Sequence, residues 1–159
     1  MATTLHLGDL LVRNGVITPR QRDDVLDAQR TRGGPFGALA EEMFGVSPQA
    51  IEKAWAEQYA ALVPHIDPRA HSINPRALDT ISRRQAWQFC ILPLDFAGED
   101  LLACTTHDNL IRALKFVGWR LGHACQFLIA EPGPMGEALA RHYPLAGMTP
   151  GDLRTGVAV

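Results

Sequence analysis

The sequence lacks the motifs of several common enzyme classes. Only Lys53 and Lys115 are lysines, and neither follows a glycine-rich loop, so the phosphate-binding loop Gly-x-x-x-x-Gly-Lys-[Ser/Thr] is missing. The Gly-x-Ser-x-Gly motif of hydrolases is missing as well. Gly8 and Gly15 follow no predicted strand, so they do not form a dinucleotide-binding fingerprint. We therefore predict that the chain is not an enzyme.

The sequence is also poor in net charge and in long apolar runs. A net charge of −2 at pH 7 differs from the clustered basic excess of nucleic-acid-binding surfaces. No apolar run approaches the roughly 20 residues that span a bilayer. Residues 1–4 contain neither the basic nor the apolar part of a secretion signal. We predict a soluble, cytoplasmic protein that neither binds nucleic acid nor inserts into a membrane.

Cysteines are few, and their number, three, is odd, so we interpret them as reduced thiols. Cys104-x-x-His107 and His123-x-Cys125 together supply the ligand types of a structural zinc site. However, Cys104 lies in a predicted strand, where a residue three positions later points to the opposite face unless the strand has ended. We therefore predict no metal site. A small metal-dependent Cys/His enzyme is the alternative from a different functional class.

The sequence does contain an internal repeat. Residues 7–29 read again as residues 36–58 without a gap, and Gly8 and Gly37 mark the constant offset of 29 positions. Such a repeat indicates two copies of one structural unit, each of which buries its apolar face against a neighbour. Because a glycine early in a helix costs about 1 kcal/mol relative to alanine, the recurring glycine predicts that a helix or a ligand approaches the backbone closely there.

Each repeat predicts two short helices. Apolar residues at positions i, i+3 and i+4 predict the first helix, and Gly15 is placed to end it. Thr18 followed by Pro19, with Gln21 completing a capping box, predicts the start of the second helix. Residues 30–35, which include two glycines, form the connector between the repeats.

The whole chain predicts an α+β fold. Residues 1–61 form a four-helix tandem-repeat subdomain, and residues 62–144 form a small α/β sandwich with a mixed sheet of three to four strands. The elements expected in the second part are a short extended segment at 63–68, a helix at 74–83, strands at 89–96 and 101–105 joined as a hairpin, a helix at 108–121, a strand at 125–129 and a helix at 134–143. Residues 145–159 are predicted to be a mobile tail.

The first repeat resembles a known family. The pattern Leu7-Gly8-x-x-Leu11-Val12-x-x-Gly15-x-Ile17, followed by Leu26-x-x-Gln29, is similar to the repeated motif in the N-terminal domain of type II secretion and type IV pilus assembly ATPases. The MshEN variety of this domain binds cyclic di-GMP through two tandem motifs. The resemblance covers roughly residues 5–143. It implies a non-enzymatic regulatory or docking module, and because the chain contains no motor, a standalone module or a fragment of a longer protein.

The resemblance also implies a ligand site, in degenerate form. Each family motif begins Arg-Leu-Gly, and the arginine engages guanine, but His6 and Pro35 occupy those positions here, and Arg22 replaces an expected leucine. Charge-assisted hydrogen bonds contribute about 1.5–3 kcal/mol each, so the loss of two weakens binding by roughly 10²- to 10⁴-fold. Arg30 and Arg32 in the connector are candidates for partial compensation. The residues implied as ligand contacts are His6, Leu7, Gly8, Asp9, Leu11, Val12, Gly15, Gln29, Arg30, Arg32, Phe36, Gly37 and Gln58.

Partners follow from the same resemblance. In the ATPases this region precedes the motor and contacts the cytoplasmic part of an inner-membrane platform protein. We therefore expect a protein partner of that kind or a secretion or pilus ATPase, with cyclic di-GMP as a regulatory ligand and no cofactor. Related modules accompany glycosyltransferases of surface-polysaccharide systems, which is the alternative process.

Overall fold

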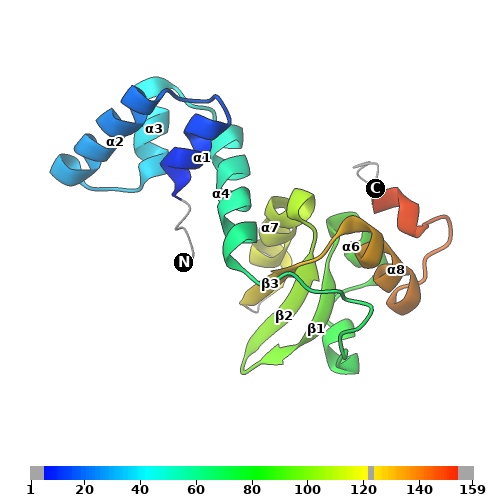
Figure 1. The fold of residues 1–159 in the computed structure, drawn as a ribbon. Helices are drawn as coiled ribbons and strands as arrows, with labels where there is room; N and C mark the ends of the chain where they lie inside the picture. Colours follow the sequence, from blue (N-terminus) through cyan, green and yellow to red (C-terminus); the bar gives the residue numbers. More distant parts are fainter. Residues whose placement is uncertain (1–5, 122–123, 154–159) are drawn as a thin grey trace. The chain divides into compact units, whose positions relative to one another are not determined.

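The computed structural model describes residues 6–121 and 124–153, and the chain divides into two compact units, residues 1–62 and 63–159. The described residues form eight α-helices, two short 3₁₀-helices and a three-stranded mixed sheet (Figure 1). The predicted α+β class is therefore confirmed. None of the helices in these described ranges is long and apolar enough to span a membrane.

The N-terminal unit consists of α1 (Leu7–Arg13), α2 (Pro19–Arg32), α3 (Phe36–Phe44) and α4 (Pro48–Leu62). Helices α1 and α2 belong to the first repeat, and α3 and α4 to the second. Helix α1 packs on α4, and α2 packs on α3. Each repeat therefore places its first helix against the second helix of the other repeat, so the two copies form one interlocked unit.

Local signals set the helix ends in this unit. The predicted capping box is present, because the Thr18 hydroxyl accepts from the Gln21 amide at 3.1 Å and the Gln21 side chain accepts from the Thr18 amide at 2.9 Å. Gly15 follows α1 with a φ of 74°, and Gly45 ends α3 with a φ of 62°. Both values lie in the left-handed region that glycine adopts without steric cost.

The core of the N-terminal unit consists of equivalent residues from the two sequence repeats. It consists of eight buried residues, Leu10, Leu11, Ile17 and Val25 from the first copy and Leu39, Ala40, Val46 and Ala54 from the second. These are four pairs of equivalent residues, each pair separated by the same 29 positions that separate Gly8 from Gly37. The sequence repeat is therefore an approximate two-fold repetition of one packing arrangement.

The C-terminal unit is built on a sheet with strand order β1-β2-β3. Strand β1 (Leu92–Ala97) pairs antiparallel with β2 (Asp100–Thr105) in the predicted hairpin, and β2 pairs parallel with β3 (Cys125–Ile129). The 3₁₀-helix η1 (His107–Asn109) and α7 (Leu110–Arg120) lie in the parallel crossover, and α8 (Pro132–His142) follows β3. The predicted order of these elements is correct.

The segment before the sheet differs from the prediction. Instead of one helix at 74–83, the chain forms α5 (Pro75–Leu78) and α6 (Arg83–Phe89). A second capping box, between Ser82 and Gln85, starts α6, and Cys90 ends it with a φ of 55°. The expected strand at 89–96 therefore begins only at Leu92. The extended segment at 63–68 contributes a single bridge, between His65 and Ile129, so the sheet has three strands.

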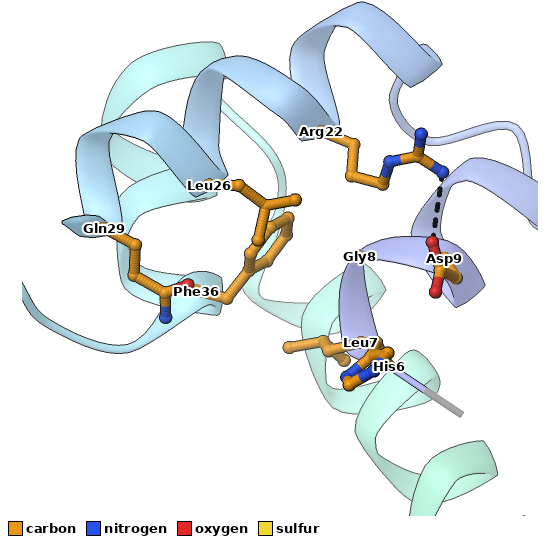
Figure 2. A pocket seen from close by; sticks show the side chains of 8 residues that line it. All are labelled: His6, Leu7, Gly8, Asp9, Arg22, Leu26, Gln29 and Phe36. Atoms are coloured by element: carbon orange, nitrogen blue, oxygen red, sulfur yellow. Dashed lines mark hydrogen bonds and ion pairs between the residues drawn. The ribbon is translucent and has the colours of Figure 1, made fainter. Parts of the chain in front are cut away.

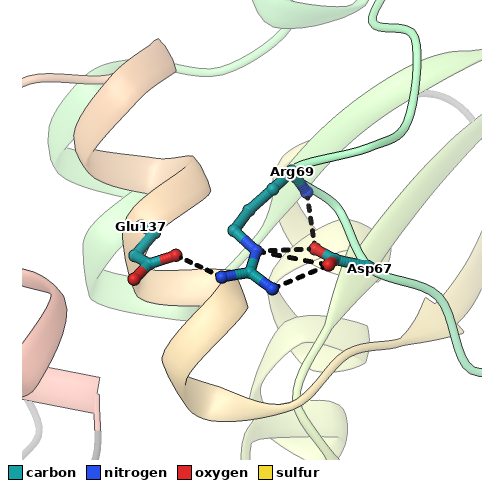
Figure 3. Close-up of polar contacts among 3 residues, drawn as sticks. All are labelled: Asp67, Arg69 and Glu137. Atoms are coloured by element: carbon teal, nitrogen blue, oxygen red, sulfur yellow. Dashed lines mark hydrogen bonds and ion pairs between the residues drawn. The ribbon is translucent and has the colours of Figure 1, made fainter.

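A cluster of ion pairs links residues 67–69, which precede α5, to α8 (Figure 3). Arg69 donates from Nη2 to Asp67 Oδ2 at 2.8 Å and from Nη1 to Glu137 Oε2 at 2.7 Å. The backbone contributes in the same place, because the Ile66 amide donates to the Ile129 carbonyl at 2.9 Å. The cluster therefore holds the first residues of the C-terminal unit beside β3 and α8.

The region predicted as a mobile tail contains an ordered element. The 3₁₀-helix η2 (Pro150–Leu153) packs on α8, and the Pro150 backbone approaches Gly136 so closely that a Cβ there would lie 2.5 Å from the Pro150 carbonyl oxygen. The absence of a side chain at Gly136 therefore makes room for η2 against α8. The remainder of the predicted tail, residues 154–159, lies outside the described residues.

Candidate functional site

The N-terminal unit contains a hollow of about 380 Å³ between α1, α2 and the start of α3 (Figure 2). We call it the first-repeat hollow. Its lining residues are His6, Leu7, Gly8, Asp9, Arg22, Leu26, Gln29 and Phe36. Six of these, all except Arg22 and Leu26, are among the ligand residues that the sequence resemblance implies. The structure therefore brings together about half of the predicted site.

The side chains of Phe36 and Arg22 pack against α1 at Gly8. A Cβ at this position would stand 2.8 Å from Phe36 Cζ and 3.1 Å from Arg22 Cγ. Gly37 repeats the arrangement, because a Cβ there would stand 2.9 Å from Ile51 Cγ2 and 3.7 Å from Leu7 Cδ2. The close approach predicted at both glycines is therefore present, and side chains of neighbouring helices make it.

Polar groups lie on one side of the hollow. Arg22 reaches from α2 toward α1 and donates from Nη1 to Asp9 Oδ1 at 3.0 Å (Figure 2), and its Nε donates to Asp23 Oδ1 at 3.3 Å. The Arg22 side chain is 30% exposed and that of Asp9 is 49% exposed. His6 precedes α1, is exposed, and makes no side-chain capping bond to the helix. At the far end of the hollow, Gln29 Nε2 donates to the Gly34 carbonyl at 3.1 Å.

The other predicted ligand residues lie elsewhere. Leu11 is fully buried in the core, and Val12 packs against that core. Arg30 and Arg32 lie in the last turn of α2 rather than in the predicted connector. Arg30 pairs with Asp27 at 3.3 Å and Arg32 with Glu42 at 2.8 Å, so both arginines are engaged on the surface. Gly15, Gly37 and Gln58 are likewise not among the lining residues. Their role as ligand contacts stays a prediction.

Sequence reasoning missed Arg22 and Leu26 as lining residues. Arg22, Leu26 and Gln29 are spaced i, i+4 and i+7, which places them on one face of α2. The motif already included Leu26 and Gln29, so this spacing was a signal for residue 22. The residue type gives no such signal, because arginine replaces the leucine that the motif expects at position 22.

The second repeat has apolar residues where the first has polar ones. Ala38 and Ile51 are the equivalents of Asp9 and Arg22, and Trp55 is the equivalent of Leu26. Ile51 packs against Gly37, and the Trp55 ring lies 5.4 Å from that of Tyr59. The ion pair of the first repeat is therefore not reproduced in the second.

The cysteines do not form a reactive cluster in the part of the chain that the structure describes. Cys90 and Cys104 are buried, and burial raises the pKa of both thiols. Burial, with the nearby Asp100 carboxylate, raises the pKa of Cys125 to about 12. Within residues 6–121 and 124–153, no group of three or more His, Cys, Asp and Glu residues is placed so that it could hold a metal ion. His123, one member of the zinc set considered from the sequence, lies outside the described residues.

The sequence is similar to a known domain family and to a known protein. The MshEN domain family matches residues 61–149, more than half of the chain. The type IV pilus assembly ATPase PilB of Myxococcus xanthus (strain DK1622) is 22% identical over 148 residues, which cover 93% of this chain and 26% of PilB. The chain therefore spans about a quarter of the length of this relative.

Two solved structures match this chain over most of its length. The structure of MshE with cdg (cyclic di-GMP) matches with a TM-score of 0.50 at 21% identity, covering 87% of this chain and 99% of that one. The N-terminal domain of XpsE matches with a TM-score of 0.47 at 17% identity, covering 86% and 93%. The family match lies almost wholly in the C-terminal unit, so the first-repeat hollow falls outside it. The chain belongs to the MshEN domain family and has the fold seen in the structure of MshE with cdg.

Proposed function

We propose that this chain is a non-enzymatic regulatory module of a secretion or pilus ATPase system, and that its first-repeat hollow binds cyclic di-GMP. One observation carries the proposal. The hollow gathers six residues that the family resemblance implies as cyclic di-GMP contacts, and they come from three different helices or their caps. The likeness to MshE with cdg supports the same ligand at the level of the fold.

The chemistry of the hollow suits one guanine nucleotide unit. Its volume of about 380 Å³ lies in the range of small-molecule sites, roughly 300–1,000 Å³. Leu7, Leu26 and Phe36 offer apolar surface to a purine ring, and Phe36 offers an aromatic one. Arginine and the histidine ring are suited to bind phosphate oxygens or the acceptor edge of guanine. In this proposal, the apolar wall holds the base and the polar side holds its acceptors.

Binding is expected to be weak. His6 offers at most two ring N–H donors, whereas the arginine it replaces in the motif would supply a guanidinium with five N–H donors. In the second repeat, Pro35 precedes α3 and Ile51 occupies the position of Arg22. A symmetric cyclic dinucleotide thus finds polar recognition in only one of the two repeats. We propose that this module responds to high concentrations of its ligand, or that it has retained mainly a docking role.

Calorimetric titration of the purified chain with cyclic di-GMP tests the ligand. We expect measurable but weak binding, and we expect His6→Arg to tighten it about tenfold or more, because a charge-assisted hydrogen bond contributes about 1.5–3 kcal/mol. The matched control is His71→Arg, the same change in the C-terminal unit, which should leave binding unaltered. Gly8→Val should abolish binding, with circular dichroism checking that the helices persist.

The titration can contradict the proposal. If neither the native chain nor His6→Arg binds at several hundred micromolar, the nucleotide is removed from the proposal and a docking module remains. The proposed partner, an ATPase of the secretion or pilus type or its platform protein, is then tested directly by co-purification. Retention of such a partner by the native chain supports docking, whereas the failure of both partners to bind contradicts it.

A further inference from the structure

We infer that Arg22 recognises a phosphate group of the nucleotide bound in the first-repeat hollow, and that Asp9 competes with this phosphate for the Arg22 guanidinium. This inference rests on the proposed function and gives it a specific chemistry. Both residues line the hollow, and they approach it from different helices, α2 and α1 (Figure 2). The Asp9 carboxylate therefore stands where a ligand anion would otherwise meet the arginine.

The geometry of Arg22 leaves room for an anion. Nη1 is held by Asp9 Oδ1 at 3.0 Å and Nε by Asp23 Oδ1 at 3.3 Å, while Nη2 makes no hydrogen bond with the described residues. The stem of the side chain is fixed, because its Cγ lies over Gly8 in the packed crossing of α1 and α2. A guanidinium on a fixed stem with one unused nitrogen is suited to receive a phosphate, which arginine often binds through two parallel bonds.

Asp9 is a competitor that a ligand can displace. The carboxylate is 49% exposed, and ion pairs at such exposure contribute little to stability because water and salt screen them. A bidentate phosphate bond is stronger than a single bond to an exposed carboxylate. Asp9 thus lowers the affinity for any anionic ligand without closing the hollow.

The repeat supplies an internal comparison. The second copy has Ala38 in place of Asp9 and Ile51 in place of Arg22, so the acid and the base are both absent there. The core pairs around them are otherwise retained, as for Leu10 and Leu39. Packing of the repeat therefore needs neither charge, which favours a binding role for the pair over a structural one.

Titration of five chains with cyclic di-GMP tests the inference. These are the native chain, Asp9→Asn, Arg22→Met, the double variant and Asp24→Asn. Asp9→Asn should tighten binding about two- to fivefold, the effect of removing an exposed competing ion pair. Arg22→Met keeps the apolar stem over Gly8 and should weaken binding about 10- to 100-fold, the effect of losing a charge-assisted bond. In the double variant, the gain from Asp9→Asn should vanish.

Asp24→Asn is the matched control. Asp24 lies on α2, is exposed, and its replacement makes the same change of net charge without touching Arg22. It should leave the affinity close to that of the native chain. A second readout is ionic strength. Affinity of the native chain should fall with added salt, and this dependence should weaken in Arg22→Met, an effect that a purely structural arginine would not produce.

Each outcome decides between the two proposals. If the native chain binds and Asp9→Asn binds no tighter, or Arg22→Met binds equally well, the inference is wrong and the proposed function stands. If only Asp9→Asn binds, the inference holds, and the native chain is not a cyclic di-GMP sensor. If no chain binds, the inference is wrong and the nucleotide is removed from the proposed function. If Asp24→Asn tightens binding as much as Asp9→Asn, general charge explains the effect and the inference is again wrong.

Discussion

Gly8 lies directly against the ring of Phe36, the residue that begins α3, so that a Cβ on Gly8 would stand 2.8 Å from Phe36 Cζ. Phe36 is the second-repeat equivalent of Leu7, and Leu7 in turn lies near Gly37. The first apolar residue of each repeat therefore packs against the glycine of the other. A Cβ would meet Phe36 Cζ at 2.8 Å on Gly8 and Ile51 Cγ2 at 2.9 Å on Gly37, so close packing accounts for the glycine at both positions.

Gly37→Ala should destabilise the N-terminal unit. The added Cβ would meet Ile51 Cγ2 at 2.9 Å. This methyl branches from the Ile51 Cβ, so relief requires either a disfavoured χ1 rotamer of Ile51 or a shift of α4. Overpacking costs about 1–3 kcal/mol, and the better helix propensity of alanine offsets up to about 1 kcal/mol of it. We expect the free energy of unfolding to fall by about 1–2 kcal/mol, measured by urea denaturation.

Gly118→Ala is the control for that experiment. Gly118 lies within α7, and a Cβ there would meet nothing within 4 Å. The propensity gain should therefore act alone and raise the stability of the C-terminal unit by about 0.5–1 kcal/mol. If Gly37→Ala stabilised the protein as much as Gly118→Ala, this result would contradict the close contact between Gly37 of α3 and Ile51 of α4.

Gly136→Ala should release η2 from α8. A Cβ on Gly136 would lie 2.5 Å from the Pro150 carbonyl oxygen and 2.8 Å from its Cα, and backbone atoms cannot yield as a flexible side chain can. Hydrogen exchange of the Asp152 amide, which donates to the Thr149 carbonyl at 3.0 Å, should therefore become faster. Amides in β2 should exchange as in the native chain. An unchanged exchange rate of the Asp152 amide would show that the position of η2 does not depend on the close contact with Gly136.

Asp67 should titrate below the usual aspartate range. The side-chain hydrogen bonds from Arg69 hold the pKa of Asp67 below its ordinary value of about 3.9. A lowered folded-state pKa means that this stabilisation is present above the unfolded value and is lost as the pH falls through the folded value. NMR titration of the carboxyl should show the low midpoint, and Arg69→Gln should return it toward 3.9. An ordinary midpoint in the native chain would contradict the ion-pair cluster.

The three thiols should react slowly in the folded protein. Burial raises the pKa of Cys90 and Cys104, and that of Cys125 rises to about 12, so the thiolate is scarce at pH 8. A chromogenic disulfide reagent should modify less than one thiol rapidly in the native state and all three after denaturation. Fast reaction of one thiol, suppressed by added zinc, would favour the metal site that the sequence analysis considered.

The sequence by itself determined the elements whose signals are local. Thr18 with Gln21 marked the start of α2, and the 29-residue offset between Leu10 and Leu39 specified the paired core. Capping and periodicity depend on residues that are close in the sequence, so helix ends and buried faces can be predicted without knowledge of the tertiary structure. A local signal also contradicts the prediction of one helix at 74–83, because the capping box between Ser82 and Gln85 starts a separate helix, α6.

Only the tertiary structure decided which residues line the hollow. Arg22 and Asp9 are 13 positions apart, and nothing in their spacing requires that they meet. Their contact depends on how α1 crosses α2, which the packing of Gly8 against Phe36 sets from the other repeat. Likewise, Arg30 and Arg32 were candidates by charge, but neighbouring acids on α2 and α3 engage them. Helical spacing places Arg22 on the same face of α2 as Leu26 and Gln29, but only long-range packing brings Asp9 of α1 against it.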